Sequence, residues 1–363
     1  MKIIHFCESL ASGGGIASFI ANLTHEQSKT NNVTVCSIFH SNGEVDLNTN
    51  VTTYNLGKTE AGFSVKYPLR VLRFLSKNHY DIVHIHSAFL YYALAVVFLH
   101  RRSKFVYTIH TDARRENSNQ WDRLFLWLKR WCFKHHWMHP VTISQVSKES
   151  FDDLYGMESH LIYNGIRKRV PTPNIVNLSQ YKVTSKTRVF IHPGRISEAK
   201  NQVVLCRAFK KVIDDGHDVV LLIAGTVQDK QIFDQINNFL CNRIIYIGQR
   251  SDVLELLSEA DAMCLSSIWE GLPITLLEAM SVGCIPICTP VGGIVDVLKD
   301  NHNGVLASST DETDYYLALC RFLELGSQQI EDIKSACLEE FEEYNITKTS
   351  ALYIDYYKRI ACD

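Results

Sequence analysis

The chain has 363 residues, more than one hydrophobic core usually holds, so its length predicts two domains. With 46% hydrophobic and 21% charged residues, it is neither a disordered nor a fibrous protein. The net charge of −2 excludes a uniformly basic nucleic-acid binder. The two halves nevertheless have opposite net charges: residues 1–169 hold 20 Lys and Arg against 13 Asp and Glu, and the remainder holds 17 against 26.

Short apolar runs alternate with helical patterns along the whole chain. In the first half we expect a helix over residues 16–27 and strands at residues 3–7, 33–39, 81–86, 104–110 and 140–144. In the second half we expect strands at residues 188–194, 218–225, 243–249, 261–267 and 284–289. This alternation predicts an α/β fold of two facing, Rossmann-like, doubly wound parallel-sheet domains with a cleft between them.

The domain boundary is expected at residues 169–186, which contain two of the eight prolines and no sustained periodicity. We interpret this stretch as a linker between an N-terminal domain, residues 1–168, and a C-terminal domain, residues 187–344. The final stretch, about 345–363, has the spacing of a helix.

The eleven cysteines are an odd number and fall mostly inside apolar runs. Reduced core thiols and a cytoplasmic location are therefore favoured over a disulfide framework. The first residues lack a signal-peptide pattern, and no apolar stretch is long enough to span a bilayer, so any membrane contact is expected to be peripheral.

A glycine run follows the first strand and precedes the first helix. Gly13, Gly14 and Gly15 would let backbone N–H groups at a helix N-terminus approach a phosphate, although a flexible turn explains the run equally well. The run is not G-x-G-x-x-G, which disfavours a nicotinamide dinucleotide.

Charged residues follow two strand ends of the second half. Arg195 and Lys200 suit a diphosphate, the alternative being a solvated turn. Glu270 precedes a helix, and Glu278 lies in that helix within the apolar sequence LLEAM. Carboxylates there could accept hydrogen bonds from sugar and ribose hydroxyls. The alternative is that Glu270 is a charge favoured by the helix dipole and that Glu278 is a solvated residue.

The glycine run, GRISEAKN at 194–201, EGLP with LLEAM at 270–280, and VGG at 291–293 resemble the retaining GT-B glycosyltransferases of the group 1, family 4 type. DIVHIHS at 81–87, TIHT at 108–111, TISQ at 142–145 and YNGI at 163–166 follow the family's order. The resemblance implies transfer of a sugar from a UDP- or GDP-sugar to a glycan or lipid-linked acceptor, with retention, in the biosynthesis of cell-surface polysaccharide or lipopolysaccharide. It also implies that residues 345–363 return to the N-terminal domain.

The resemblance implies a site residue by residue. Arg195 and Lys200 would bind the diphosphate, Glu270 the sugar and Glu278 the ribose, while His110 would lie near the reacting side of the sugar. The implied catalytic set is Glu270, His110, Arg195 and Lys200. The implied donor-binding set adds Gly14, Gly15, Gln249, Arg250, Gly271, Leu272, Pro273, Ile274, Thr275 and Glu278. Ser144 and Asn164 match positions that line the family's cleft.

No Asp-x-Asp pair occurs in the sequence, so we expect no metal ion and no cofactor, the nucleotide-sugar being a substrate. Two alternatives remain open. One is a nucleotide-sugar epimerase or hydrolase of the same fold, and the other is a catalytically silent partner subunit. His84 and His86 alternate along a strand and are interpreted as packing residues.

Two basic amphipathic stretches, residues 66–77 and 101–137, could contact the anionic inner face of the cytoplasmic membrane. Residues 101–137 hold nine Lys and Arg against three Asp and Glu, interleaved with aromatic residues. For the aromatics we favour packing: Trp127 and Trp131, four residues apart, would pack on the sheet while the cations face water. Aromatic residues beside cations would also suit single-stranded nucleic acid, but no other feature of the sequence supports that partner, and we expect none.

Overall fold

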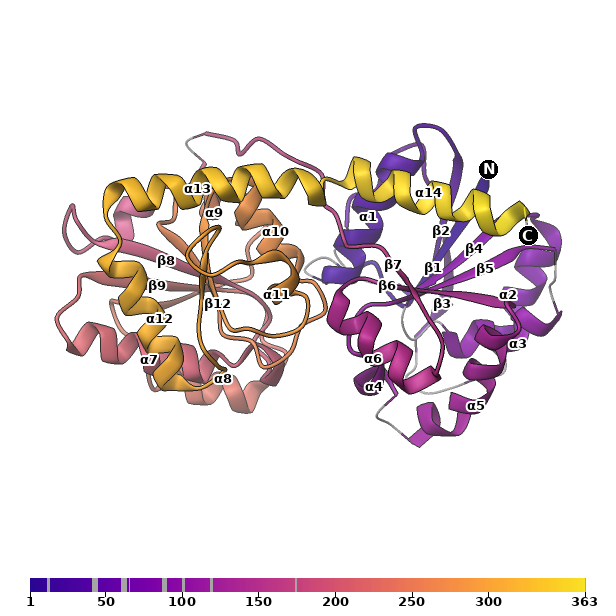
Figure 1. Cartoon of the computed structure of the whole chain (residues 1–363), viewed down its shortest axis with the longest axis horizontal. Helices are drawn as coiled ribbons and strands as arrows, with labels where there is room; N and C mark the ends of the chain where they lie inside the picture. Colours follow the sequence, from indigo (N-terminus) through magenta and orange to yellow (C-terminus); the bar gives the residue numbers. More distant parts are fainter. Residues whose placement is uncertain are drawn as a thin grey trace. The chain divides into compact units, whose positions relative to one another are not determined.

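The computed structural model describes residues 1–11, 14–40, 45–59, 64, 66–86, 90–99, 102–117, 120–173 and 175–362, without the side chains of residues 91, 95 and 120–124. It divides into two compact units, shown in Figure 1. The first unit comprises Met1–Arg167 with Asn345–Asp363, and the second comprises Lys168–Tyr344.

The first unit is built on a seven-stranded parallel sheet with the order β3-β2-β1-β4-β5-β6-β7. Its strands are β1 (Lys2–Cys7), β2 (Asn32–Phe39), β3 (Thr52–Lys58), β4 (Ile82–His86), β5 (Lys104–Ile109), β6 (Met138–Thr142) and β7 (His160–Leu161). The order reverses between β1 and β4. At such a switch point the loops leave toward opposite faces of the sheet, which opens a place for ligands at the carboxyl strand ends.

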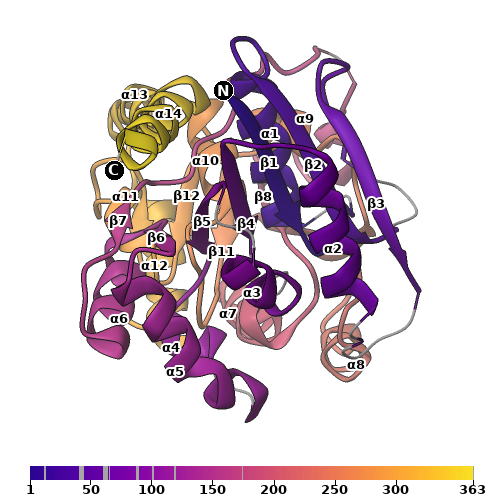
Figure 2. The same cartoon turned by 90° about the vertical axis from the view of Figure 1, so that its right-hand side faces the viewer.

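Helices cover both faces of this sheet (Figures 1 and 2). One face carries α1 (Gly15–Gln27) and α14 (Ile346–Cys362); the other carries α2 (Lys66–Lys77), α3 (Leu90–Leu99), α5 (Gln120–Lys134) and α6 (Gln145–Tyr155), and α4 (Ala113–Glu116) packs on α6. Strand residues alternate between the faces: Ile4 and Phe6 enter the main apolar core, whereas His5 faces α1.

The second unit has a six-stranded parallel sheet with the order β10-β9-β8-β11-β12-β13, which reverses between β8 and β11. Its strands are β8 (Arg188–Pro193), β9 (Val219–Ala224), β10 (Ile244–Gly248), β11 (Ala262–Leu265), β12 (Ile285–Cys288) and β13 (Val305–Leu306). One face carries α7 (Gln202–Asp214), α8 (Lys230–Asn237) and α12 (Glu312–Glu324), and the other carries α9 (Val253–Glu259), α10 (Ile274–Ser281) and α13 (Ser327–Phe341) (Figure 1). The short α11 (Ile294–Val297) and three 3₁₀ turns, Leu178–Tyr181, Glu198–Lys200 and Glu342–Tyr344, complete the described elements.

The expected fold class is confirmed as two parallel-sheet α/β units. Three observed strands were not expected. One of them, β3, is an edge strand with largely exposed polar residues, so it lacks the apolar run that marks the buried strands. The other two, β7 and β13, have two residues each.

The eleven cysteines are free thiols, eight of them buried. The helices that the structure describes include none with the length and apolar character to cross a membrane.

Candidate functional site

The second unit brings an expected cation and an expected acid into contact at its topological switch point. The loop after β8 carries Lys200, the loop after β11 carries Glu270, and the Lys200 Nζ lies 2.5 Å from the Glu270 Oε1. The Ser267 hydroxyl donates to the same Oε1 at 2.6 Å. No described residue bonds the second carboxylate oxygen, Oε2. The carboxylate is therefore held at one oxygen, and the other is left for a ligand.

The two loops that carry this pair are joined by a side-chain and a backbone hydrogen bond. The Ser266 hydroxyl donates to the carbonyl of Lys200 at 2.9 Å, and the Ile268 amide donates to the carbonyl of Ala199 at 2.8 Å. Ser266 is fully buried at the end of β11, where a hydroxyl without a partner would be costly. These bonds fix the separation of the two loops, and with it the placement of Lys200 against Glu270.

A buried histidine and glutamine hold the loop of Arg195. His192 donates from Nδ1 to the Cys264 carbonyl at 2.8 Å, so its Nε2 accepts from the Gln202 amide at 3.1 Å. The same Gln202 amide donates to the Arg195 carbonyl at 2.7 Å. Burial lowers the pKa of His192 to about 4, so the ring is neutral at pH 7. Sequence reasoning missed both residues, although a histidine at the end of a buried strand was a signal.

Two glycines are required where strand-end loops touch. Gly225 has φ 156°, and a Cβ there would lie 2.0 Å from the Gly194 carbonyl oxygen. Gly292 has φ 54°, and a Cβ there would lie 2.0 Å from the Glu270 carbonyl oxygen. Because no side chain fits at either position, the loops after β9 and β12 can pack directly on the loops that carry Arg195 and Glu270.

Glu278 lies in the second turn of α10, which begins at Ile274. Burial raises the pKa of Glu278 to about 7, and nearby Arg169 partly opposes that shift. At the start of the same helix, Pro273 offers no side-chain cap. The first-turn amides of Ile274 and Thr275, two of the positions expected to meet phosphate or sugar, thus receive no side-chain cap from Pro273, and Leu272 lies before the helix.

The remaining expected donor residues of this unit are more exposed. Arg195, Gln249 and Arg250 are all solvent-exposed. The Arg250 guanidinium makes two bonds to Asp252, at 2.8 and 2.5 Å, which raise the pKa of Arg250. Gly271 accepts a hydrogen bond from the Gly293 amide at 2.5 Å and so belongs to the packed loops.

The expected residues of the first unit lie at its carboxyl strand ends. Gly14 is the N-cap of α1 and makes no side-chain cap, and Gly15 is the first helical residue; Gly13 lies outside the described residues. His110 follows β5, and its Nε2 lies 2.9 Å from the His86 Nδ1. Ser144 is buried and caps α6 by accepting from the Ser147 amide at 3.1 Å, and Asn164 is also buried.

Among the described residues, one group of side chains has the composition of a metal site: His5, His84 and His86, whose ligand atoms lie within 4.8 Å of one another. All six ring nitrogens already have hydrogen-bond partners. His84 contacts the hydroxyls of Tyr357 and Thr108, both at 2.6 Å. His5 contacts Gln27 and His86, and His86 also contacts His110. His84 and His86, interpreted from the sequence as packing residues, are fully buried and hydrogen-bonded at both ring nitrogens.

The basic helices differ in part from expectation. In α2 the cations Lys66, Arg70, Arg73 and Lys77 are exposed, while Tyr67, Val71 and Leu75 are buried. In α5 the packing prediction is wrong for Trp127, which is 66% exposed, although Trp131 does pack on Phe98 and Trp137. The physical reason is the orientation of the helix, since its inward face carries Cys132, Phe133 and the buried Lys129, which bonds Asn117 at 2.8 Å. Arg101 and the side chain of Arg123 lie outside the described residues.

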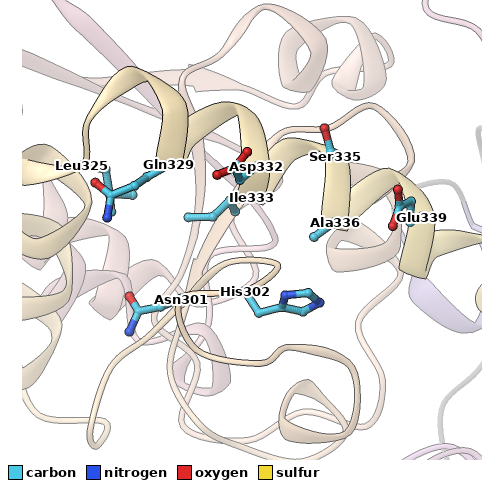
Figure 3. Close-up of a pocket in the computed structure, with 9 residues that line it drawn as sticks. All are labelled: Asn301, His302, Leu325, Gln329, Asp332, Ile333, Ser335, Ala336 and Glu339. Carbon is cyan, nitrogen blue, oxygen red and sulfur yellow. The ribbon is translucent and has the colours of Figure 1, made fainter.

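Two described cavities lie away from the expected donor residues. One, of about 440 Å³, lies between α13 and the turn at residues 301–302, as Figure 3 shows. The other, of about 830 Å³, is in the first unit and is lined by residues that include Arg130, His160 and Arg359. Neither contains a residue of the expected catalytic or donor-binding set.

Solved structures with the same fold include HepE of Anabaena in complex with UDP and glucose. It superposes with a TM-score of 0.82 at 18% identity, over 99% of each chain. This likeness defines the fold class, the GT-B architecture of two Rossmann-like units.

Two family models divide the chain between them. Residues 13–169 match Glycosyltransferase Family 4, and residues 177–336 match Glycosyl transferases group 1. The chain belongs to this family of glycosyltransferases.

Its relatives include an Escherichia coli UDP-Gal:alpha-D-GlcNAc-diphosphoundecaprenol alpha-1,3-galactosyltransferase, 27% identical over 71% of this chain and 70% of the relative. The N-acetyl-alpha-D-glucosaminyl L-malate synthase of Bacillus anthracis is 27% identical over 53% of each chain, so the match spans about half the length of that relative.

Proposed function

We propose that the protein transfers a sugar from a UDP- or GDP-sugar to a lipid-linked glycan acceptor, with retention at the anomeric carbon. The observation that carries the proposal is the Lys200–Glu270 pair at the switch point between β8 and β11. The UDP bound by HepE supports a nucleotide donor, and the diphosphoundecaprenol acceptor in the name of the Escherichia coli relative supports a lipid-linked acceptor in polysaccharide biosynthesis.

The leaving diphosphate would be stabilised by this chain's own cations. Lys200 is largely enclosed, and Arg195 is exposed on the same loop. The Lys200 ammonium would therefore be a fixed charge, and the Arg195 guanidinium would be a mobile donor of two hydrogen bonds. The amides at the start of α10 add donors without competing side chains. We propose that these groups act without a divalent ion, in keeping with the lack of an Asp-x-Asp pair in the sequence.

Glu270 would orient the donor sugar. A carboxylate that is held by an ammonium and a hydroxyl at Oε1 is a weak nucleophile, because both bonds stabilise its charge. Its free Oε2 is suited to accept from sugar hydroxyls. This arrangement favours attack of the acceptor on the same face as the departing phosphate, which would itself take up the acceptor proton.

The acceptor would reach the first unit from an anionic membrane surface. The exposed cations of α2 and the exposed Trp127 of α5 are suited to the headgroup region of such a surface, where cations meet anionic lipids and an indole ring lies at the interface. We therefore propose a peripheral location on the cytoplasmic face of the membrane.

The test is turnover of a panel of UDP- and GDP-sugars with diphosphoundecaprenol-linked acceptors, with and without EDTA. Lys200→Ala should lower kcat/KM about 100-fold, whereas Lys210→Ala, which removes an exposed lysine of α7 paired with Asp214, should leave it unchanged. Parent activity in the Lys200→Ala variant would contradict the proposal. Release of free or epimerised sugar without acceptor would establish the hydrolase or epimerase instead, and no turnover of any donor would establish a silent subunit.

A further inference from the structure

Four polar side chains form a hydrogen-bonded line across the first unit. The Gln27 Oε1, at the end of α1, lies 2.8 Å from the His5 Nε2; the His5 Nδ1 lies 3.1 Å from the His86 Nε2; and the His86 Nδ1 lies 2.9 Å from the His110 Nε2. His5 and His86 are fully buried, and His110 is partly exposed at the carboxyl end of the sheet. The line therefore connects an amide in the core to a ring at the expected site.

The protonation of these rings follows from their burial. Burial lowers the pKa of His5 to about 4 and that of His110 to about 3, and it lowers the pKa of His86 well below its ordinary value, with the charges of neighbouring histidines adding to the effect. At pH 7 each ring is neutral and carries a single N–H.

The Gln27 oxygen then determines which nitrogen of each ring has the proton. Because Oε1 can only accept, His5 must donate from Nε2 and accept at Nδ1. His86 must likewise donate from Nε2, and so must His110. The remaining nitrogen, the His110 Nδ1, is left as an acceptor, and no described residue bonds it.

The orientation of the Gln27 amide is the starting point of this sequence of donors. The structure places the Gln27 Oε1 at 2.8 Å from the His5 Nε2, and no described acceptor lies in hydrogen-bonding position for the Gln27 Nε2. A reversed amide would donate to His5, reverse all three hydrogen bonds and turn the His110 Nδ1 into a donor.

We propose that Gln27, His5 and His86 are positioning residues that hold His110 in the tautomer whose Nδ1 accepts a hydrogen bond from a sugar hydroxyl. The inference rests on the proposed function, which places a sugar beside His110. The line cannot carry a proton away from the substrate, because a carboxamide does not take one up. His110 would thus orient a hydroxyl, and it would not act as the general base.

The tautomers can be read directly from the full chain labelled with ¹⁵N-histidine, since long-range ¹H–¹⁵N spectra separate protonated from unprotonated ring nitrogens. Signals are assigned by their loss in His110→Gln. We expect the Nε2–H tautomer at His110 in the parent and a mixture of tautomers in Gln27→Met and in His86→Leu. Thr108→Val, which removes a buried hydroxyl bonded to His84 and outside the line, should leave His110 unchanged. An Nδ1–H tautomer or a cationic His110 in the parent at pH 7 would overturn the proposal.

Kinetics separate this inference from the proposed function. Gln27→Met should lower kcat about five- to tenfold with little change in the donor KM, the size expected for one misdirected hydrogen bond. An altered tautomer with parent kcat would show that His110 does not meet the substrate through Nδ1 and would reject the positioning role. A parent without transferase activity would reject the proposed function, while the spectra would still report whether Gln27 sets the tautomer.

Discussion

The Glu270 carboxylate shares one of its oxygens with the Lys200 ammonium at 2.5 Å, so the acid expected to hold the sugar and the cation expected to hold the diphosphate are bonded before any ligand enters. An arriving diphosphate would compete with Glu270 for the same ammonium, which has three N–H donors to divide between them. In the proposed function the pair would serve two subsites, and its two members should respond differently to substitution.

Glu270→Gln removes the competing negative charge but keeps the shape of the side chain. We expect this variant to bind UDP or GDP at least as tightly as the parent, because Lys200 is freed for the diphosphate, and to lose about 100-fold in sugar transfer, because the charged acceptor of the sugar hydroxyls is gone. Titration calorimetry and turnover measure the two effects. Lys200→Ala is the matched comparison, in which nucleotide binding and transfer should both fall; weaker nucleotide binding in Glu270→Gln would contradict the competition.

Gly292→Ala tests the packing of the loop after β12 on the Glu270 loop. The added Cβ would lie 2.0 Å from a carbonyl oxygen, so the two loops must separate, and the φ of 54° adds backbone strain. We expect a loss of about 2–4 kcal/mol in the free energy of unfolding together with weaker donor binding. Denaturant unfolding and calorimetry provide the measurements.

Gly216→Ala is the control for this substitution. It has a φ of 91° but nothing within 4 Å of an added Cβ, so it should cost only the backbone strain of about 1 kcal/mol and leave donor binding intact. Equal losses of unfolding free energy and donor binding in Gly292→Ala and Gly216→Ala would mean that the contact of Gly292 with the Glu270 loop contributes to neither.

Glu278 should make donor binding depend on pH. Its pKa of about 7 means that lowering the pH below 7 protonates the carboxyl, which then accepts fewer hydrogen bonds from ribose hydroxyls. We expect the donor affinity to rise between pH 6 and pH 8 in the parent. The affinity of Glu278→Gln should be weak and constant over the same range; a parent affinity without pH dependence would remove Glu278 from the nucleotide site.

A rise in pH should have the opposite effect on stability: through Glu278 it should raise the donor affinity but lower the free energy of unfolding. Its pKa is raised by folding, so between pH 4.5 and pH 7 the folded protein binds more protons than the unfolded chain, and the free energy of unfolding falls as the pH rises. Glu278→Gln removes this cost, and we expect it to be more stable than the parent by about 1–2 kcal/mol at pH 8 and similar at pH 4. Thermal unfolding at the two pH values is the measurement.

The proposed membrane contact through α5 would depend on Trp127, which the fold leaves exposed. Trp127→Ala should weaken binding to anionic vesicles about tenfold, because an interfacial indole and its apolar area are lost. Leu352→Ala removes an exposed apolar side chain from α14 and is the matched control. Vesicle co-sedimentation at two salt concentrations reports both variants, and equal binding by Trp127→Ala and the parent would exclude this helix.

The two sheets could be predicted from the sequence because buried parallel strands appear as apolar runs, and the residues that follow them mark the carboxyl edge. Lys200 and Glu270 were assigned to the same site on that basis. Neither the contact of His5 with His86 nor the role of Gln27 could be derived in this way, because both depend on β1 lying beside β4, far away in sequence. The orientation of α5 was also mispredicted, since an i,i+4 aromatic pair does not reveal that a lysine occupies the inward face.

The return of the chain to its first unit affects the order in which the protein can be completed during synthesis. Tyr353 and Tyr357 of α14 are fully buried and contact Thr108 and His84, which precede them by 245 and 273 residues. Until those tyrosines leave the ribosome, the part of the first sheet that α14 covers, with the buried His84, stays open to water. The second unit, whose residues are contiguous, does not depend on such a later segment.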